Sequence, residues 1–233
     1  MWFGHSEAIW REYPELVAGV IEASGINGAP SVERPVAELA TIAETRLASG
    51  PESELPEIKA WRRVFRRMGL EPTQYRCAAE ALLRRYRKEG SLPRLHPLVD
   101  LCNAASLAYA IPVAVFDVPK VSGFLEVRHA AGTESYLAFS GELETPPEGE
   151  VIFADSAGRA HARRWTNRQS AYSAVRAETA RVLIVAEGVH ETASADVRRL
   201  IETLAAEIER IWSISPRGGG VVASSPHFEL QTP

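Results

Sequence analysis

The segment from Asp100 to Asp117, DLCNAASLAYAIPVAVFD, runs from a helical pattern through a proline into a short apolar strand. The polar residues Asp100, Asn103 and Ser106 fall three apart on one face of this helix. Apolar residues recur at helical spacing on another face, at Leu98, Leu101, Cys102, Ala105 and Ala108. The segment therefore predicts a helix–strand junction that can hold a site. A buried helix with a few capping polar residues is the alternative.

Periodic segments on both sides of this junction predict further helices and strands. Before it, residues 16–22 favour a strand, and residues 35–48, 57–68 and 73–89 favour helices. After it, Gly, Pro and Glu turns separate short predicted strands at residues 124–129, 136–139, 151–155 and 159–165. A short helix at 170–176, a strand at 181–186 and a long helix with Ser194 as its N-cap follow. Runs of strands between runs of helices predict an α+β fold.

The chain of 233 residues, 45% hydrophobic and 24% charged, has the composition of a globular protein with a substantial core. We expect one domain at residues 55–215, with residues 1–54 as a helix and strand extension packed on it. Residues 216–233 contain Gly218-Gly219-Gly220 and then Ser-Ser-Pro, which predicts a flexible C-terminal tail. The glycine triplet lacks the following Lys and Ser or Thr of a phosphate-binding loop.

The cysteines and histidines of the chain give no sign of a metal or cofactor site. Cys77 and Cys102 form no CxxC pair, and the six histidines are scattered singly, so we expect two buried thiols, no disulfide and no metal. No window is apolar enough to span a bilayer, and the N-terminus lacks a basic segment followed by an apolar one. The expected location is the cytoplasm.

Basic residues concentrate between Lys59 and Arg94, although the formal net charge of the whole chain is −4. Eleven basic residues face three acidic ones in this stretch, and Arg62, Arg63, Arg66 and Arg67 are predicted on one side of a helix. Such a stretch can receive the phosphates of a nucleic acid. Two solvated, arginine-rich helix faces are the alternative.

The spacing from Asp100 through Asn103 and Pro112 to Phe116-Asp117 resembles a segment of the B3/B4 editing domain in the β chain of bacterial phenylalanyl-tRNA synthetase. That segment reads Asp-x-x-Asn, then Gly-Gln-Pro-Leu-His-Ala-Phe-Asp. The likeness extends to free-standing relatives of that domain through short motifs whose order covers roughly residues 55–189. These motifs are Pro56–Ile58, Ala60–Arg62, Tyr75-Arg76, Glu80–Arg85, Val99-Asp100, Gly123–Arg128, Phe153–Asp155, Arg164–Gln169 and Thr179–Glu187.

This resemblance implies a free-standing B3/B4-like domain with a mixed, mainly antiparallel β core flanked by helices. It implies hydrolysis, in trans, of the ester of a mischarged tRNA, with the aminoacylated 3′ end as partner. We expect no cofactor, and neither DNA nor a membrane as partner. Because the ester is already activated, a positioned water and a stabilised oxyanion suffice. The resemblance does not name the amino acid.

The expected site residues combine this likeness, which carries Asn103 and Glu187, with the polar and aromatic cluster at residues 165–169 and the basic stretch. The expected catalytic residues are Asn103, which would orient the water or the carbonyl, Glu187, which would bind the α-ammonium, and Arg168, which would stabilise an oxyanion. Expected substrate-binding residues are Ser106, Trp165, Asn167, Gln169 and Arg76, and expected RNA-binding residues are Arg62, Arg63, Arg66, Arg67, Arg84 and Arg85. A solvated strand-end Glu187 and a plain ion-pair ladder of Arg76, Glu80 and Arg84 are the alternatives.

One departure from the pattern keeps other functions open. Ala114 stands where the synthetase segment has histidine, and Ala110-Ile111 replaces its Gly-Gln. Either the mechanism needs no histidine, the substrate differs, or the domain only binds. A non-catalytic RNA-binding or partner-binding module and a protein that hydrolyses or binds a small amino-acid-like molecule therefore remain alternatives.

Overall fold

The predicted junction is confirmed in the computed structural model, which describes residues 1–231. Helix α5 (Pro97–Tyr109) begins at His96, whose ring accepts a hydrogen bond from the backbone N–H of Leu98, and Pro97 fills the first helical position. The helix ends at Ala110, which has a left-handed φ of 56°. Strand β3 (Val113–Asp117) follows directly after Pro112.

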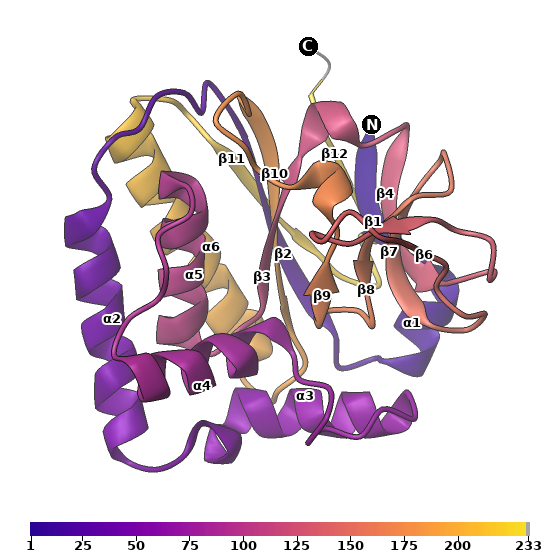
Figure 1. Cartoon of the computed structure of the whole chain (residues 1–233), viewed down its shortest axis with the longest axis horizontal. Coiled ribbons are helices and arrows are strands. Elements are labelled where there is room, and N and C mark those ends of the chain that lie inside the picture. The colour runs from indigo at the N-terminus through magenta and orange to yellow at the C-terminus, as the bar shows by residue number, and fades with distance from the viewer. Residues whose placement is uncertain (232–233) are drawn as a thin grey trace.

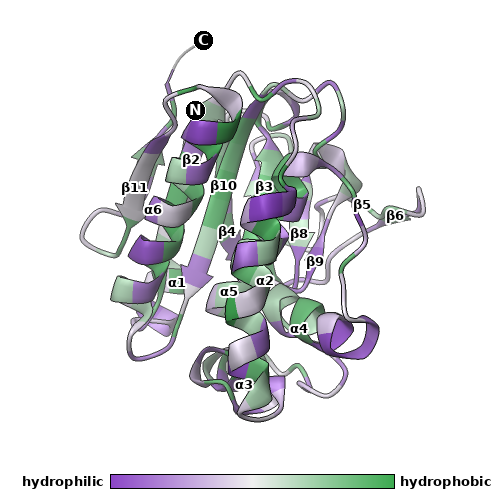
Figure 2. Ribbon diagram, turned by 90° about the vertical axis from the view of Figure 1, so that its left-hand side faces the viewer, coloured by the Kyte–Doolittle hydropathy of each residue, from purple (hydrophilic) through white to green (hydrophobic). Residues whose placement is uncertain are grey.

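A four-stranded antiparallel sheet lies at the centre of the molecule (Figure 1). Its order is β11 (Arg217–Val221), β2 (Val17–Ser24), β10 (Arg181–Gly188) and β3. Helices α5 and α6 (Ala193–Trp212) cover one face of it, and α2 (Glu33–Ala48) packs on the outer side of α5. Figure 2 shows largely hydrophobic residues along β10 and β3, next to these helices. The apolar side chains of this sheet and these helices form one of the two main hydrophobic cores.

A second, six-stranded sheet packs on the other face. Its order is β12 (His227–Glu229), β1 (Trp2–His5), β4 (Phe124–His129), β7 (Val151–Asp155), β8 (Ala160–Arg163) and β9 (Arg168–Gln169). β1 and β4 run parallel in it, whereas the other neighbouring strands that the structure describes in this sheet are antiparallel. Phe116 of one sheet packs on Phe153 of the other, with ring centroids 5.4 Å apart. The expected α+β fold with a mixed, mainly antiparallel core is confirmed.

The remaining elements are short helices, turns and one hairpin outside the two sheets. Helix α1 (Glu7–Glu12) follows β1, and a small hairpin is formed by β5 (Tyr136–Leu137) and β6 (Leu143–Glu144). Short 3₁₀ turns lie at Glu52–Glu54, Val118–Lys120 and Ala171–Ser173. Helices α3 (Pro56–Arg67) and α4 (Ala78–Glu89) lie across one end of the molecule (Figure 1).

The predicted flexible tail is wrong for residues 217–231. Strand β11 contains the glycine triplet and pairs with β2 over five residues, and β12 pairs with β1. Glu22 of β2 is buried and accepts hydrogen bonds from Arg181, from Arg217 and from the backbone N–H of Gln231. Residues 217–229 therefore contribute one strand to each of the two sheets.

Both cysteines are free and buried, as expected. Burial raises the pKa of the Cys77 thiol to about 12 and also raises the pKa of Cys102, so both stay protonated at neutral pH. None of the helices within residues 1–231 is long and apolar enough to cross a membrane.

Candidate functional site

A buried carboxylate at the end of β10 is the centre of the site. Glu187 is 2% exposed, and its Oε1 atom lies 2.7 Å from Nε2 of His5 and 2.9 Å from Nε1 of Trp165. Within residues 1–231 its other oxygen, Oε2, receives no hydrogen bond from the chain. Because a buried carboxylate is costly unless it is paired, the free oxygen can bind a cationic or hydrogen-bond-donating ligand.

Glu187 lines a small pocket, which we call the Glu187 pocket, of about 60 Å³. Its other walls are Pro112 to Ala114 at the start of β3, Phe153 of β7, Ala162 of β8, Val185 of β10, Ala78 at the start of α4, and the segment Trp165 to Gln169. The volume suits a few water molecules or a small polar group. The first backbone N–H of α4 is already used, since Ala78 donates to the carbonyl of Thr166.

Trp165 is held in the pocket wall by an uncommon backbone conformation. Arg164 and Trp165 have φ values of 46° and 56°, which cost about 1–2 kcal/mol per residue outside glycine. The fully buried indole packs edge-on against Trp61, with centroids 5.2 Å apart, and against Tyr13. Its N–H donates to Glu187. These contacts fix the indole as a donor to the carboxylate and leave no face of it open for stacking a base.

A second and larger cavity, which we call the Asn103 cavity, adjoins the first. Its volume is about 520 Å³, and it is lined by Asn103 of α5, by Val113 and Val115, by Gln169 and by Phe139. Val113 and Gln169 line both cavities. Gln169 is held there because its side-chain amide donates to the carbonyl of Val115 at 2.6 Å. Asn103 and Glu187 thus lie on two adjoining cavities that share a wall.

Other expected substrate-binding residues serve the framework. Ser106 is fully buried and donates to the carbonyl of Ile111 at 2.7 Å, so it stabilises the end of α5 and lines neither cavity. Asn167 lines the Glu187 pocket, but its amide donates to the carbonyl of Arg76. The Arg76 side chain lies 3.5 Å from Glu80. Exposed Arg168 pairs with Glu144 at 2.9 Å on the rim of the pocket.

Most arginines expected to bind RNA already have acidic partners. Arg62 makes a two-pronged contact with the buried Glu80, Arg84 pairs with Glu52, and Arg85 pairs with Glu89. Arg67 pairs with Glu15 and lies over the ring of Tyr13. Within residues 1–231, Arg63 and Arg66 are the members of this set that form no ion pair, and both are exposed. The basic stretch is therefore much less positive in the fold than in the sequence.

A buried Asp–His–Ser arrangement in the six-stranded sheet is structural. His161 lies 3.1 Å from Asp155 and 2.8 Å from the hydroxyl of Ser173. All three are 2% exposed or less, and Ser173 lines neither cavity, so no substrate reaches its hydroxyl. Nucleophilic catalysis needs an accessible hydroxyl as well as a neighbouring base. The arrangement instead ties the β7–β8 hairpin to the turn after β9.

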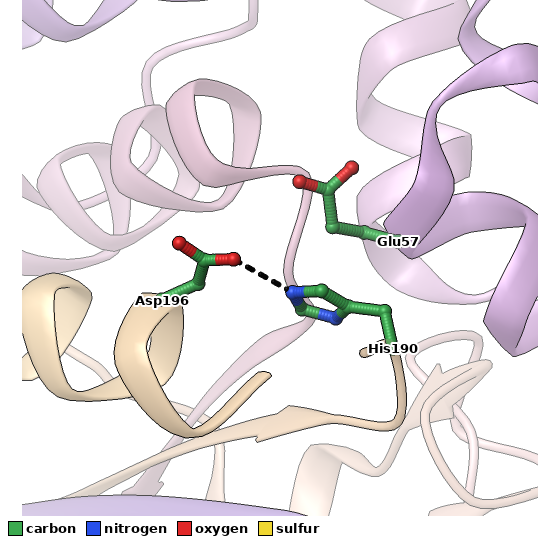
Figure 3. Close-up of side chains that lie close together, drawn as sticks. All are labelled: Glu57, His190 and Asp196. Carbon is green, nitrogen blue, oxygen red and sulfur yellow. Dashed lines mark hydrogen bonds and ion pairs between the residues drawn. The ribbon is translucent and has the colours of Figure 1, made fainter. Parts of the chain in front are cut away.

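A second carboxylate and histidine cluster joins α3, the loop after β10, and α6. Figure 3 shows Glu57, His190 and Asp196, whose ligand atoms lie within 4.8 Å of one another. Arg46 contacts both oxygens of Glu57 at 2.7 Å, and Arg199 pairs with Asp196. A divalent cation there would lie beside two guanidinium groups, so these residues fit an ion-pair network between helices better than a metal site.

The sequence did not point to His5 as a site residue. It lies 182 positions from Glu187 and has no motif around it. Only the fold, which brings the end of β1 in one sheet to the end of β10 in the other, joins the two side chains. The group Trp165 to Gln169 was visible in the sequence as a dense polar and aromatic cluster, and all of its members line the Glu187 pocket.

Comparisons with known proteins find one family of domains and several similar proteins. The B3/4 domain family matches residues 60–210. The phenylalanine–tRNA ligase β subunit of Legionella pneumophila (strain Paris) is 26% identical over 134 residues, which are 58% of this chain and 16% of that protein. The corresponding subunit of Cereibacter sphaeroides is 34% identical over 73 residues, 31% of this chain and 9% of that protein.

A solved structure is also similar. It is an N-terminal fragment of the phenylalanyl-tRNA synthetase β subunit from Pyrococcus horikoshii, with 11% identity and a TM-score of 0.49, covering 92% of this chain and 50% of that one. The chain thus spans less than a fifth of the length of the two bacterial ligase subunits. The family match covers well over half of the chain, and the chain therefore belongs to the B3/4 domain family.

Proposed function

We propose that this protein hydrolyses the ester of a mischarged aminoacyl-tRNA in trans. The observation that carries the proposal is Glu187, a buried carboxylate with one oxygen open to a small pocket. An aminoacyl ester carries a primary ammonium group next to its carbonyl, and this group is the natural partner of such an oxygen. Membership of a family that also occurs in phenylalanine–tRNA ligases supports an RNA-linked substrate.

The two adjoining cavities suit the two ends of an aminoacyl group. The ammonium would bind Glu187 in the Glu187 pocket, which is too small for a large side chain. The Asn103 cavity, of about 520 Å³, falls within the usual 300–1,000 Å³ of small-molecule sites and could take the side chain. Asn103 would then hold the ester carbonyl or the attacking water from the wall of that cavity.

Little further chemistry is required of the chain. Water would attack the ester carbonyl, the bond from that carbon to the ribose oxygen would break, and the ribose hydroxyl would leave with a proton. Asn103 would stabilise the oxyanion as it forms, an effect worth about 3–4 kcal/mol for one well-placed donor in other acyl-transfer enzymes. Arg168 on the rim could add to this stabilisation only by giving up its pairing with Glu144.

A second candidate is a non-catalytic module that binds tRNA or another partner. It is favoured by Ala114, which lies in the wall of the Glu187 pocket at the position where the resembled synthetase segment has histidine. An alanine methyl can neither accept nor donate a proton, so this position supplies no general base. A protein that acts on a small amino-acid-like ligand is the third candidate, and the many paired arginines of α3 and α4 are compatible with it.

The test is deacylation of a panel of labelled aminoacyl-tRNAs, with tRNA binding measured on the same samples. We expect selective hydrolysis by the wild-type protein and at least a tenfold loss of kcat/KM in both Asn103→Ala and Glu187→Gln. Glu209→Gln, which changes an exposed carboxylate of α6, is the matched control and should be as active as wild type. Binding without hydrolysis of any ester would overturn the enzyme proposal and favour the binding module.

A further inference from the structure

His5 reaches the site from a part of the chain that the family match does not include. It ends β1 of the six-stranded sheet, whereas Glu187 lies on β10 of the four-stranded sheet. His5 is 1% exposed, and its Nε2 atom lies 2.7 Å from Oε1 of Glu187. The matched family region begins at residue 60. The N-terminal strand thus supplies a direct contact to the carboxylate of the proposed site.

The surroundings of His5 select one form of its ring. Nδ1 is buried and has no hydrogen-bond partner within residues 1–231. The ring packs against Phe3 and Trp10, with centroids 5.3 and 4.8 Å away. Because a carboxylate oxygen only accepts, Nε2 carries the proton of the contact with Glu187, and a further proton on Nδ1 would be a buried donor without an acceptor. The favoured form is therefore the neutral ring with its proton on Nε2, which donates to Glu187.

This form leaves the negative charge of the pair on Glu187. A neutral imidazole binds the carboxylate by a hydrogen bond without cancelling its charge, and the Trp165 N–H does the same. Both donors meet at Oε1. The other oxygen is then fixed in direction, since a carboxylate held at one oxygen by two donors from different elements cannot turn freely about its last torsion.

We propose that His5 is a positioning residue for Glu187, holding its Oε1 so that Oε2 points to a ligand ammonium group. The inference rests on the ammonium-binding role of Glu187 in the proposed function. It adds that the first strand is part of the site, and that recognition of a free amine depends on a neutral histidine outside the family-matched region.

The first test measures preference for a free amine without requiring hydrolysis. The probes are the amides of the twenty amino acids and their N-acetyl counterparts, with binding measured by calorimetry. We expect the wild type to bind at least one amide tenfold or more tightly than its N-acetyl form. His5→Phe removes the donor and should reduce this ratio to near one, whereas His5→Gln keeps an N–H donor and should retain most of it.

A packing control separates positioning from simple destabilisation. Phe3→Leu disturbs the core beside the His5 ring but removes no donor, so it should lower thermal stability while keeping the amine preference. Retention of the preference in His5→Phe, or its equal loss in Phe3→Leu, would overturn the inference, and so would a wild-type protein with no amine preference. Amine preference without hydrolysis of any aminoacyl-tRNA would overturn only the proposed enzymatic function.

A spectroscopic test examines the ring itself. The nitrogen chemical shifts of His5 should report a ring that is protonated at Nε2 and not at Nδ1 in the free protein. They should move in Glu187→Gln, because the hydrogen-bond acceptor changes, and should not move in the surface control Glu209→Gln. A ring protonated at Nδ1, or nitrogen chemical shifts that are unchanged in Glu187→Gln, would contradict the proposed contact.

Discussion

At the scale of single residues, Asp155 illustrates how the fold uses a buried charge. One oxygen accepts the backbone N–H groups of Ala157 and Arg159, and the other accepts that of Ser122 and contacts His161. Burial raises the pKa of this carboxyl, but the hydrogen bonds from His161 and the backbone outweigh it and lower the pKa from 3.8 to about 2. Asp155 therefore stabilises the turn after β7 in its ionised form.

The free energy of unfolding at acidic pH should depend on Asp155. Because the pKa of Asp155 is lower in the folded chain than the unfolded 3.8, its contribution is fully present above pH 4 or so and is lost as the pH falls through about 2. The shift corresponds to about 2 kcal/mol. We expect Asp155→Asn to lower the free energy of unfolding at pH 7 by about this amount, with the deficit shrinking between pH 4 and 2. Urea denaturation at a series of pH values measures it.

The control for this prediction is Glu209→Gln, an exposed carboxylate on α6, whose deficit should stay small at every pH. A deficit of Asp155→Asn that does not change with pH would mean that the variant only disturbs packing. The same experiment would then assign the acid sensitivity of the chain to other carboxyls, of which Asp196 also has its pKa lowered to about 2, by Thr192, Arg199 and His190 against the effect of burial.

Residue roles could be predicted from sequence only where neighbours in the chain are neighbours in the fold. Trp165 to Gln169 form one turn and one short strand, so their grouping survives folding. His5 could not be found, because its partner lies on a strand of another sheet. Ser106 was expected beside Asn103, but it points to the carbonyl of Ile111, because three residues advance the helix by about 300° rather than a full turn.

At the scale of elements, the periodicity of apolar residues located most helices and strands correctly. The errors lie mainly at the ends of the predicted elements. The strands predicted at 124–129 and 151–155 coincide with β4 and β7, and the helix predicted at 57–68 is α3. The helix predicted from residue 73 begins only at Ala78, since residues 71–75 form a separate turn. Ser194 was expected as N-cap of the last helix, but that place is taken by Thr192.

Strand β11 was missed in the sequence because a run of glycines is typical of a flexible linker and also occurs in a strand at the edge of a sheet. The three glycines at the centre of β11 carry no side chains, and the pairing partner β2 lies about 200 residues earlier. Gly219 needs its small size, since an added Cβ would lie 2.8 Å from the Phe228 ring. What holds the strand is therefore backbone pairing together with the contacts of Glu22, none of which leaves a local pattern.

Removal of the Glu22 charge should loosen this end of the chain. Burial raises the pKa of Glu22, but the hydrogen bonds from Arg181, Arg217 and Gln231 outweigh it and lower the pKa overall. Glu22→Gln leaves two arginines without their carboxylate, so we expect unfolding to cost about 3 kcal/mol less. Hydrogen exchange should accelerate most at residues 217–221. Unchanged protection of β11 in the variant would show that backbone pairing alone holds it.

At the scale of the whole molecule, charge is distributed differently in the fold than along the chain. The stretch from Lys59 to Arg94 is strongly basic in sequence, yet Glu15, Glu33, Glu52 and Glu54 approach it from outside and neutralise much of it. Local counting could not find these partners. With a formal net charge of −4, nonspecific attraction to RNA is weak, so any phosphate contacts must come from the few cations that lack partners.

Arg63 and Arg66 of α3 are such cations, and they give the last prediction. Both are exposed on α3, on the side of the helix away from the buried Trp61, so a nucleic acid can reach them from solvent. In wild type the logarithm of tRNA affinity should fall linearly with the logarithm of salt concentration. The double variant Arg63→Glu, Arg66→Glu should bind more weakly, with a slope shallower by about 1.4–1.8, since each lost phosphate contact contributes about 0.7–0.9.

The control for this prediction is Arg198→Glu, which changes an exposed arginine of α6 without an ion pair within residues 1–231 and should keep the wild-type slope. An equal change in both variants would indicate a general charge effect, and no change in either would place RNA contacts elsewhere or favour a small ligand.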